Sequence, residues 1–155
     1  MRRALLLALA LLAAVTATAA AAREARADEG TVDAAAALAE ADRAAIRGII
    51  ERQIEAFRRD DGAAAFGFAS PAIQRQFGTP ENFLSMVRRG YAPVYRPQDV
   101  AFGPLVTIEG RIVQRVTVVG PDGRPVLALY IMEQQPDGTW RINGCILTTS
   151  DEKTT

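Results

Sequence analysis

The sequence contains no histidine, and this absence excludes more chemistry than any other feature of its composition. Without histidine the chain cannot build a Ser-His or Cys-His nucleophilic pair, use an imidazole as general base, or hold a metal through imidazole nitrogen. Lysine is almost absent as well, because Lys153 is the only one among 18 basic residues, and 18 acidic residues balance them. A chain without net charge favours neither nucleic acid nor anionic lipid as a partner.

Cysteine is equally scarce. Cys145 is the only one, so no disulfide can form within the chain. Its neighbours Ile146 and Leu147 are apolar, which indicates a buried packing role and not a reactive thiol. The acidic residues are scattered singly, without the clustering that a metal site needs. We therefore expect neither a metal nor a cofactor.

The first 22 residues have the pattern of a secretory signal peptide. Arg2 and Arg3 precede the apolar run ALLLALALLAAV, and the small-residue stretch TATAAAA follows it. This order predicts export, to the periplasm of a bacterium. Cleavage could follow Ala22 or come as late as Ala27. If the segment stays uncleaved, it could instead anchor the protein in the membrane.

The rest of the chain divides into a linker, one domain and a short tail. Residues 23–40 mix charge and alanine without a periodic apolar face, which is typical of a flexible linker. Residues 41–150 are long enough for one hydrophobic core, so we expect a single domain there. Residues 151–155 form the tail.

An amphipathic helix of about 17 residues is predicted from Asp42 onward. Asp60, Asp61 and Gly62 should end it, with Gly62 in the left-handed conformation that glycine adopts at least cost. The apolar residues that recur at helical spacing, and that we expect to face the core, are Ile46, Ile49, Ile50, Ile54 and Phe57.

Shorter helices are predicted next. Residues 63–69 favour a short helix. Ser70-Pro71 and Thr79-Pro80 each place a hydroxyl at a cap position before a proline at the first helical position, so each predicts a helix start. Tyr91 to Pro97 contains two prolines and is expected to be extended.

Four strand-like runs follow, at residues 98–108, 111–119, 125–134 and 139–149. The turns between them are short and contain glycine, so they join antiparallel neighbours. Residues 126–132 are apolar on both faces, which predicts a central strand. Helices would cover one side of this strand. A loop, the N-terminal segment or another subunit would cover the other side. The predicted class is α+β, with N-terminal helices on a four-stranded antiparallel sheet.

Two phrases resemble the bacterial domain-of-unknown-function family numbered 4864: FASPAIQRQFGTPENFLSMVRRGYAPVYRP (residues 68–97) and DGTWRINGCIL (residues 137–147). The order of helices and strands is similar to the nuclear transport factor 2-like, or SnoaL-like, superfamily of cystatin-like cones. This resemblance covers about residues 45–150. It implies a strongly curved sheet with a pocket beneath the helices. It implies no single activity, because members of the superfamily use the pocket differently.

Several polar residues could line such a pocket. We expect the binding residues to be Tyr91, Tyr95, Arg88 and Arg75. The two tyrosines could form a stacking wall, or they could lie at the core edge with their hydroxyls in solvent. Arg88 could hold a carboxylate, or it could balance the end of a helix. The full set of candidates is Tyr91, Tyr95, Tyr130, Arg75, Arg88 and Asp99.

The sequence favours an exported, non-catalytic domain. Such a domain would bind a small apolar molecule, or pair with another protein, for example as a homodimer through its sheet. One alternative is a cone-fold isomerase, dehydratase or cyclase with Asp99 as base and Tyr91 or Tyr95 as hydrogen-bond donor. The other interpretation of Asp99 is an aspartate at a turn or strand edge, without a catalytic role. A second alternative is a structural envelope protein tethered by an uncleaved N-terminus.

Overall fold

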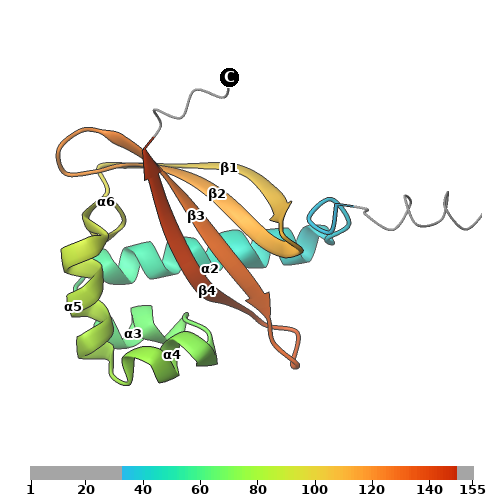
Figure 1. The fold of residues 1–155 in the computed structure, drawn as a ribbon, viewed down its shortest axis with the longest axis horizontal. Helices are drawn as coiled ribbons and strands as arrows, with labels where there is room; N and C mark the ends of the chain where they lie inside the picture. Colours follow the sequence, from blue (N-terminus) through green and yellow to red (C-terminus); the bar gives the residue numbers. More distant parts are fainter. Residues whose placement is uncertain (1–32, 150–155) are drawn as a thin grey trace, which may run out of the picture. The chain divides into compact units, whose positions relative to one another are not determined.

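Five helices and four strands make up residues 33–149, the part of the chain that this computed structural model describes (Figure 1). All the helices precede the strands, and the α+β class is confirmed. The expected signal segment and tail lie outside the described residues. The elements are α2 (Glu40–Arg58), α3 (Gly62–Gly67), α4 (Pro71–Phe77), α5 (Pro80–Gly90), α6 (Ala92–Tyr95), β1 (Asp99–Ile108), β2 (Arg111–Val119), β3 (Pro125–Gln134) and β4 (Trp140–Thr149).

The strands form one antiparallel sheet in the order β1-β2-β3-β4, as the short turns predict. The turn between β1 and β2 has two residues in the left-handed region, Glu109 with φ 50° and Gly110 with φ 74°. Two consecutive positive φ angles are the mark of a type I′ hairpin, whose twist matches that of the strands. β3 lies between β2 and β4 and is therefore central, as predicted.

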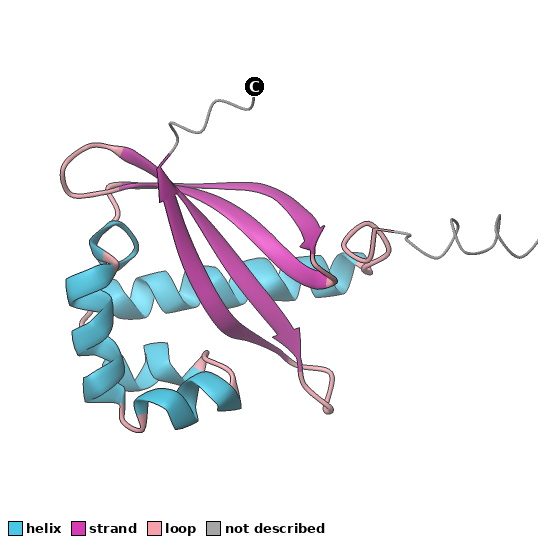
Figure 2. Ribbon diagram, in the orientation of Figure 1, coloured by secondary structure: helices cyan, strands magenta, loops and turns pink. Residues whose placement is uncertain are grey.

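The helices cover one face of the sheet. In Figure 2, α2 crosses behind the strands, and α3, α4 and α5 gather to the left of them, on the side of β4. On the covered face, Ala128 and Tyr130 of β3 are fully buried. The intervening residues Leu127, Leu129 and Ile131 are half-buried and face the other way. Within residues 33–149 this second face has no helix over it.

Two irregularities interrupt the pairing and bend the sheet, as β-bulges do. One lies in β1 between Phe102 and Leu105, and the other in β4 at Asn143. The buried side chain of Gln114 supports the first, because its amide donates to the carbonyl of Gly103 at 2.8 Å and to that of Arg115 at 2.9 Å. The carbonyl of Gly103 in the bulge thus has a hydrogen-bond partner from the protein itself.

The apolar face of α2 packs against the covered face of the sheet, as the helical spacing predicts. The helix begins at Glu40, two residues before the expected start. Gln53 is also buried, and its amide donates to the carbonyl of Ala65 at 3.1 Å, which ties α2 to α3. The predicted core residues are all buried, at 8% exposure or less: Ile46, Ile49, Ile50, Ile54 and Phe57.

The end of α2 differs from the prediction. Gly62 does not take the left-handed conformation and instead begins α3. Asp60 takes it, with φ 57°, because aspartate tolerates this region better than most residues and its carboxylate is held by two arginines. Asp61 caps α3, since its side chain accepts from the N–H of Ala64 at 3.0 Å.

The segment after α5 also differs from the prediction. Residues 92–95 are not extended but form the single turn α6. Pro93 lies in that first turn, where a missing N–H breaks no intrahelical hydrogen bond. The two predicted caps are confirmed, because Ser70 accepts from the N–H of Ile73 and Thr79 from that of Asn82.

The chain contacts the sheet before α2 begins. Ala35 is fully buried, and its N–H donates to Thr107 Oγ1 of β1 at 2.9 Å. The same hydroxyl donates to Asp33 Oδ1 at 2.5 Å. From Asp33 onward, the segment that we expected to be a linker is therefore attached to β1.

The hairpin turn generates a stability prediction. A non-glycine residue in the left-handed region is disfavoured by about 1–2 kcal/mol, and asparagine tolerates that region best. We expect Glu109→Asn to raise the free energy of unfolding by about 0.5–1 kcal/mol in urea titrations. Glu109→Ala is the control, because it removes the exposed ion pair with Arg111 but keeps the strain. An asparagine variant no more stable than the alanine variant would contradict this explanation.

Candidate functional site

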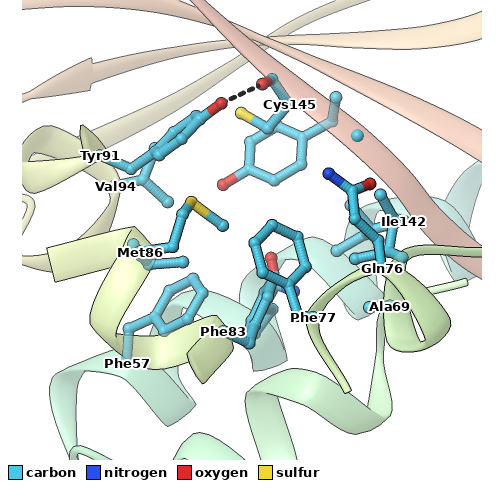
Figure 3. A pocket seen from close by; sticks show the side chains of 15 residues that line it. Phe57, Ala69, Gln76, Phe77, Phe83, Met86, Tyr91, Val94, Ile142 and Cys145 are labelled. Atoms are coloured by element: carbon cyan, nitrogen blue, oxygen red, sulfur yellow. Dashed lines mark hydrogen bonds between the residues drawn. The ribbon is translucent and has the colours of Figure 1, made fainter. Parts of the chain in front are cut away.

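A cavity of about 190 Å³ lies between the helices and the covered face of the sheet (Figure 3). The residues that line it come from all the helices except α3 and from β3 and β4, and none carries a charge. Its walls are therefore mainly hydrocarbon and aromatic surface. Among the lining residues are Phe57, Ile73, Phe77, Phe83, Met86 and Val94.

One end of the cavity depends on a connection between the helices and the edge of the sheet. Ser70 N–H donates to the carbonyl of Ile142 at 2.8 Å, and Ile142 N–H donates to that of Phe68 at 2.9 Å. Ser70 Oγ adds a hydrogen bond to Asn143 Oδ1 at 2.6 Å. These bonds start α4 at the edge of β4, so that Ile73 reaches the cavity.

Aromatic packing forms another part of the wall. The ring of Phe83 on α5 lies 6.2 Å from that of Phe57, 5.3 Å from that of Phe66 and 5.7 Å from that of Phe77, centroid to centroid. Aromatic pairs at these separations attract each other beyond the area they bury. Residues from α2, α3, α4 and α5 are thus held around one ring.

Tyr130 is one of the polar residues in this mainly apolar lining. Its side chain is fully buried on β3, and the described residues offer no hydrogen-bond partner to its hydroxyl. Burial raises the pKa of Tyr130 well above its usual value, so the group is a neutral phenol. A buried hydroxyl without a partner is costly, and it is rare in folded proteins.

Tyr91 also lines the cavity, but its hydroxyl is paired. It donates to the backbone carbonyl of Cys145 at 3.0 Å (Figure 3). Burial raises the pKa of Tyr91, and it raises the pKa of the Cys145 thiol to about 12. The thiol is therefore protonated at neutral pH, as its apolar neighbours suggest, and it is not a nucleophile.

Two glutamines complete the polar part of the lining. Gln53 uses its amide nitrogen for the hydrogen bond to Ala65. Gln76 is exposed on α4, and its side chain extends toward the cavity from the side of Ile142 (Figure 3). It is the most exposed polar side chain of the lining, because the others are buried or partly buried.

Arg88 and Tyr95 lie close together, but they belong to a different cluster. Arg88 Nε donates to Tyr95 Oη at 3.0 Å, and the Tyr95 hydroxyl donates to Asp60. Arg96 reaches the same carboxylate at 2.9 Å and stacks over the ring of Tyr95, 4.0 Å from its centroid. We call Asp60, Arg88, Tyr95 and Arg96 the Asp60 cluster. It holds the loop after α2 against α5 and α6.

The other two expected residues lie apart from the cavity. Arg75 is exposed in the last turn of α4, and Asp99 is exposed at the first position of β1. Neither lines the apolar cavity, nor the more open charged groove between α2 and β1. Of the four residues that we expected to bind a ligand, Tyr91 alone lines the cavity.

The sequence did contain a signal for Tyr130. It alternates with Ala128 and Met132 in a strand of apolar residues, and this spacing places it on the helix-covered face. The sequence could not show that the hydroxyl lacks a partner there. That fact depends on how the helices and the bulged strands close around it.

In residues 33–149 no three histidine, cysteine, aspartate or glutamate side chains gather closely enough to hold a metal ion. None of the helices in that range combines the length and the apolar character that crossing a membrane requires.

The chain matches a described protein family. A family model described as a domain of unknown function (DUF4864) matches residues 39–155. Curated proteins and solved structures give no significant match.

The unpaired hydroxyl generates an unusual stability prediction. Tyr130→Phe should raise the free energy of unfolding by about 1 kcal/mol, because it removes a buried polar group that has no partner. Tyr91→Phe is the matched control and should lower it by about 1 kcal/mol, since it leaves the Cys145 carbonyl unpaired. Urea titrations measure both values. Destabilisation by Tyr130→Phe would mean that the hydroxyl has a partner in solution.

The Asp60 cluster generates a prediction about pH. The hydrogen bond from Arg88, followed by that from Arg96, holds the pKa of Asp60 below its usual 3.8. Its contribution to stability is therefore complete above about pH 4 and is lost as the pH falls through the lowered pKa. We test this with Asp60→Asn, because asparagine tolerates the same left-handed backbone. The variant should have a lower urea midpoint at neutral pH, and its urea midpoint should fall less as the pH is lowered. An unchanged acid profile would contradict the role of the cluster.

Proposed function

The chain belongs to the family described as a domain of unknown function (DUF4864), and we propose that it binds a small, uncharged, largely apolar molecule in the cavity without transforming it. The observation that carries this proposal is a cavity lined by apolar surface and by no charged side chain. An ion in such a site would lose its hydration without gaining a partner of opposite charge. The ligand is therefore neutral.

The volume of the cavity limits the size of the ligand. A cavity of roughly 150 Å³ with apolar walls can hold benzene. The cavity here is about 190 Å³, which leaves room for one ring and a small substituent. Molecules of about ten non-hydrogen atoms fit this description.

A non-catalytic role agrees with the chemistry of the lining. Proton abstraction needs a base within one hydrogen bond, or one water, of the substrate. No carboxylate lines the cavity. Burial raises the pKa of the Cys145 thiol to about 12, so the thiol stays protonated at neutral pH and serves neither as a base nor as a nucleophile. The alternative of an isomerase-like enzyme with Asp99 as base finds no support in this arrangement.

We further propose that the domain is a cone of the nuclear transport factor 2-like superfamily. An antiparallel sheet with two bulges, helices on one face and a cavity between them support this assignment. Export to the periplasm is also a proposal, and so is tethering by an uncleaved N-terminus. Both rest on the order of basic, apolar and small residues in residues 1–22.

Self-association through the sheet stays a prediction. The face that would carry it is the one without helices in residues 33–149. Its apolar residues Leu129 and Ile146 are cross-strand partners, and Ile146 is 51% exposed. Together with the half-buried Leu127 and Ile131 they form an apolar surface of the kind that a partner covers.

Three probes of equal size test the binding proposal. Acetophenone and α-methylstyrene are neutral, and benzoate is an anion of nearly the same shape. We expect the neutral probes to bind the full chain with Kd values of about 1 mM or lower. Benzoate should bind at least about tenfold more weakly. Nuclear magnetic resonance titrations measure all three.

A cavity-filling variant locates the binding. Ile73→Trp adds volume at a half-buried lining position of α4 and should weaken both neutral probes by about tenfold or more. Arg75→Trp introduces the same side chain on the exposed side of the same helix and should change the Kd values by less than about twofold. Equal binding of benzoate, or equal effects of the two variants, would rule the proposal out.

A further inference from the structure

Resting on the proposed binding function, we propose that Tyr130 selects the ligand by donating a hydrogen bond from its hydroxyl to a neutral carbonyl oxygen. The expected ligand class is a small carbonyl compound, such as a ketone, aldehyde, ester or amide, whose remaining surface is apolar. The proposal combines two observations, a cavity with uncharged walls and a fully buried hydroxyl in its lining without a partner among the described residues.

The groups around Tyr130 leave its hydroxyl free for a ligand. Its cross-strand neighbours on the covered face are Gln114 and Cys145. The amide of Gln114 is already donated to the carbonyls of Gly103 and Arg115. The Cys145 carbonyl already accepts from Tyr91. Both groups are thus engaged with partners other than Tyr130.

The hydroxyl is suited to donate to an oxygen acceptor. Burial keeps the phenol protonated at neutral pH, so its proton is available. An unpaired donor in an apolar site is destabilising, and a ligand that accepts a hydrogen bond from it removes that cost. A ligand without an acceptor fills the same space but leaves the cost in place.

The acceptor must be neutral. No arginine or lysine lines the cavity, so a carboxylate or phosphate would meet one phenol and no positive charge. The guanidinium groups of Arg88 and Arg96, which do not line the cavity, are held by Asp60. A carbonyl group offers an acceptor oxygen without the charge.

The two neutral probes differ in this one property. Acetophenone carries a carbonyl where α-methylstyrene carries a methylene group of similar size. Their hydration differs, so the measured quantity is the ratio of their Kd values, compared between the wild-type full chain and a variant. This comparison is a double-mutant cycle in which the difference in hydration cancels.

We expect Tyr130→Phe to shift this ratio by about tenfold in favour of α-methylstyrene. Tyr91→Phe is the matched control, because its hydroxyl lines the same cavity but is already donated. It should shift the ratio by less than about twofold. Acetophenone labelled with ¹³C at the carbonyl gives a second readout. Its resonance should move downfield on binding to the wild type, and by less on binding to Tyr130→Phe.

Each outcome decides between the two proposals. If both probes bind but the ratio stays within about twofold in Tyr130→Phe, the role of Tyr130 is wrong and the binding function stands. The role of Tyr130 is also wrong if Tyr91→Phe shifts the ratio equally, or if the ¹³C resonance moves alike in wild type and Tyr130→Phe. If neither neutral probe binds the wild type, the proposed function fails, and this inference fails with it.

Discussion

The hydrogen bonds between Ile142 and the segment from Phe68 to Ser70 are the constraint on which the cavity depends. They pair the edge of β4 at Ile142 and fix the start of α4 there. A buried edge of a sheet must be paired or covered, because its N–H and C=O groups cannot be left without partners. The bulge at Asn143 adjoins this connection and supplies the acceptor for Ser70 Oγ. The edge of the sheet thus positions one helix, and the remaining helices close the space behind it.

Much of the fold could be predicted from local rules. The isoleucines of α2 repeat at helical spacing, Ser70 and Thr79 act as caps, and the four strands match their predicted runs to within one residue at their starts. Each of these features depends on neighbours in sequence, which is why it can be read there. The two wrong predictions, at Gly62 and at residues 91–97, concern positions where tertiary contacts decide between local alternatives. Asp60 takes the left-handed conformation because two arginines from distant helices and loops hold it.

The candidate site was predictable only in part, and the three tyrosines show why. Tyr91 donates to the backbone of β4, Tyr95 joins the Asp60 cluster, and Tyr130 has no partner among residues 33–149. Tyr91 and Tyr95 are four residues apart on the same short segment, yet one lines the cavity and the other does not. Every tyrosine has an apolar ring and a polar hydroxyl, so the residue type is compatible with all three of these environments. Hydrogen-bond partners more than thirty residues away distinguish them, and no local pattern records those partners.

Tyr130 also differs from the other two in its effect on stability. The Asp60 cluster and the Tyr91 hydrogen bond add to the free energy of folding, whereas the unpaired hydroxyl of Tyr130 subtracts from it. Phenylalanine would fill the same position on β3 without that cost. A destabilising polar group in a mainly apolar lining is the arrangement expected where binding, and not folding, satisfies the group. Tyr91 and Tyr95 thus stabilise the folded domain, whereas we propose that Tyr130 finds its hydrogen-bond partner in a ligand.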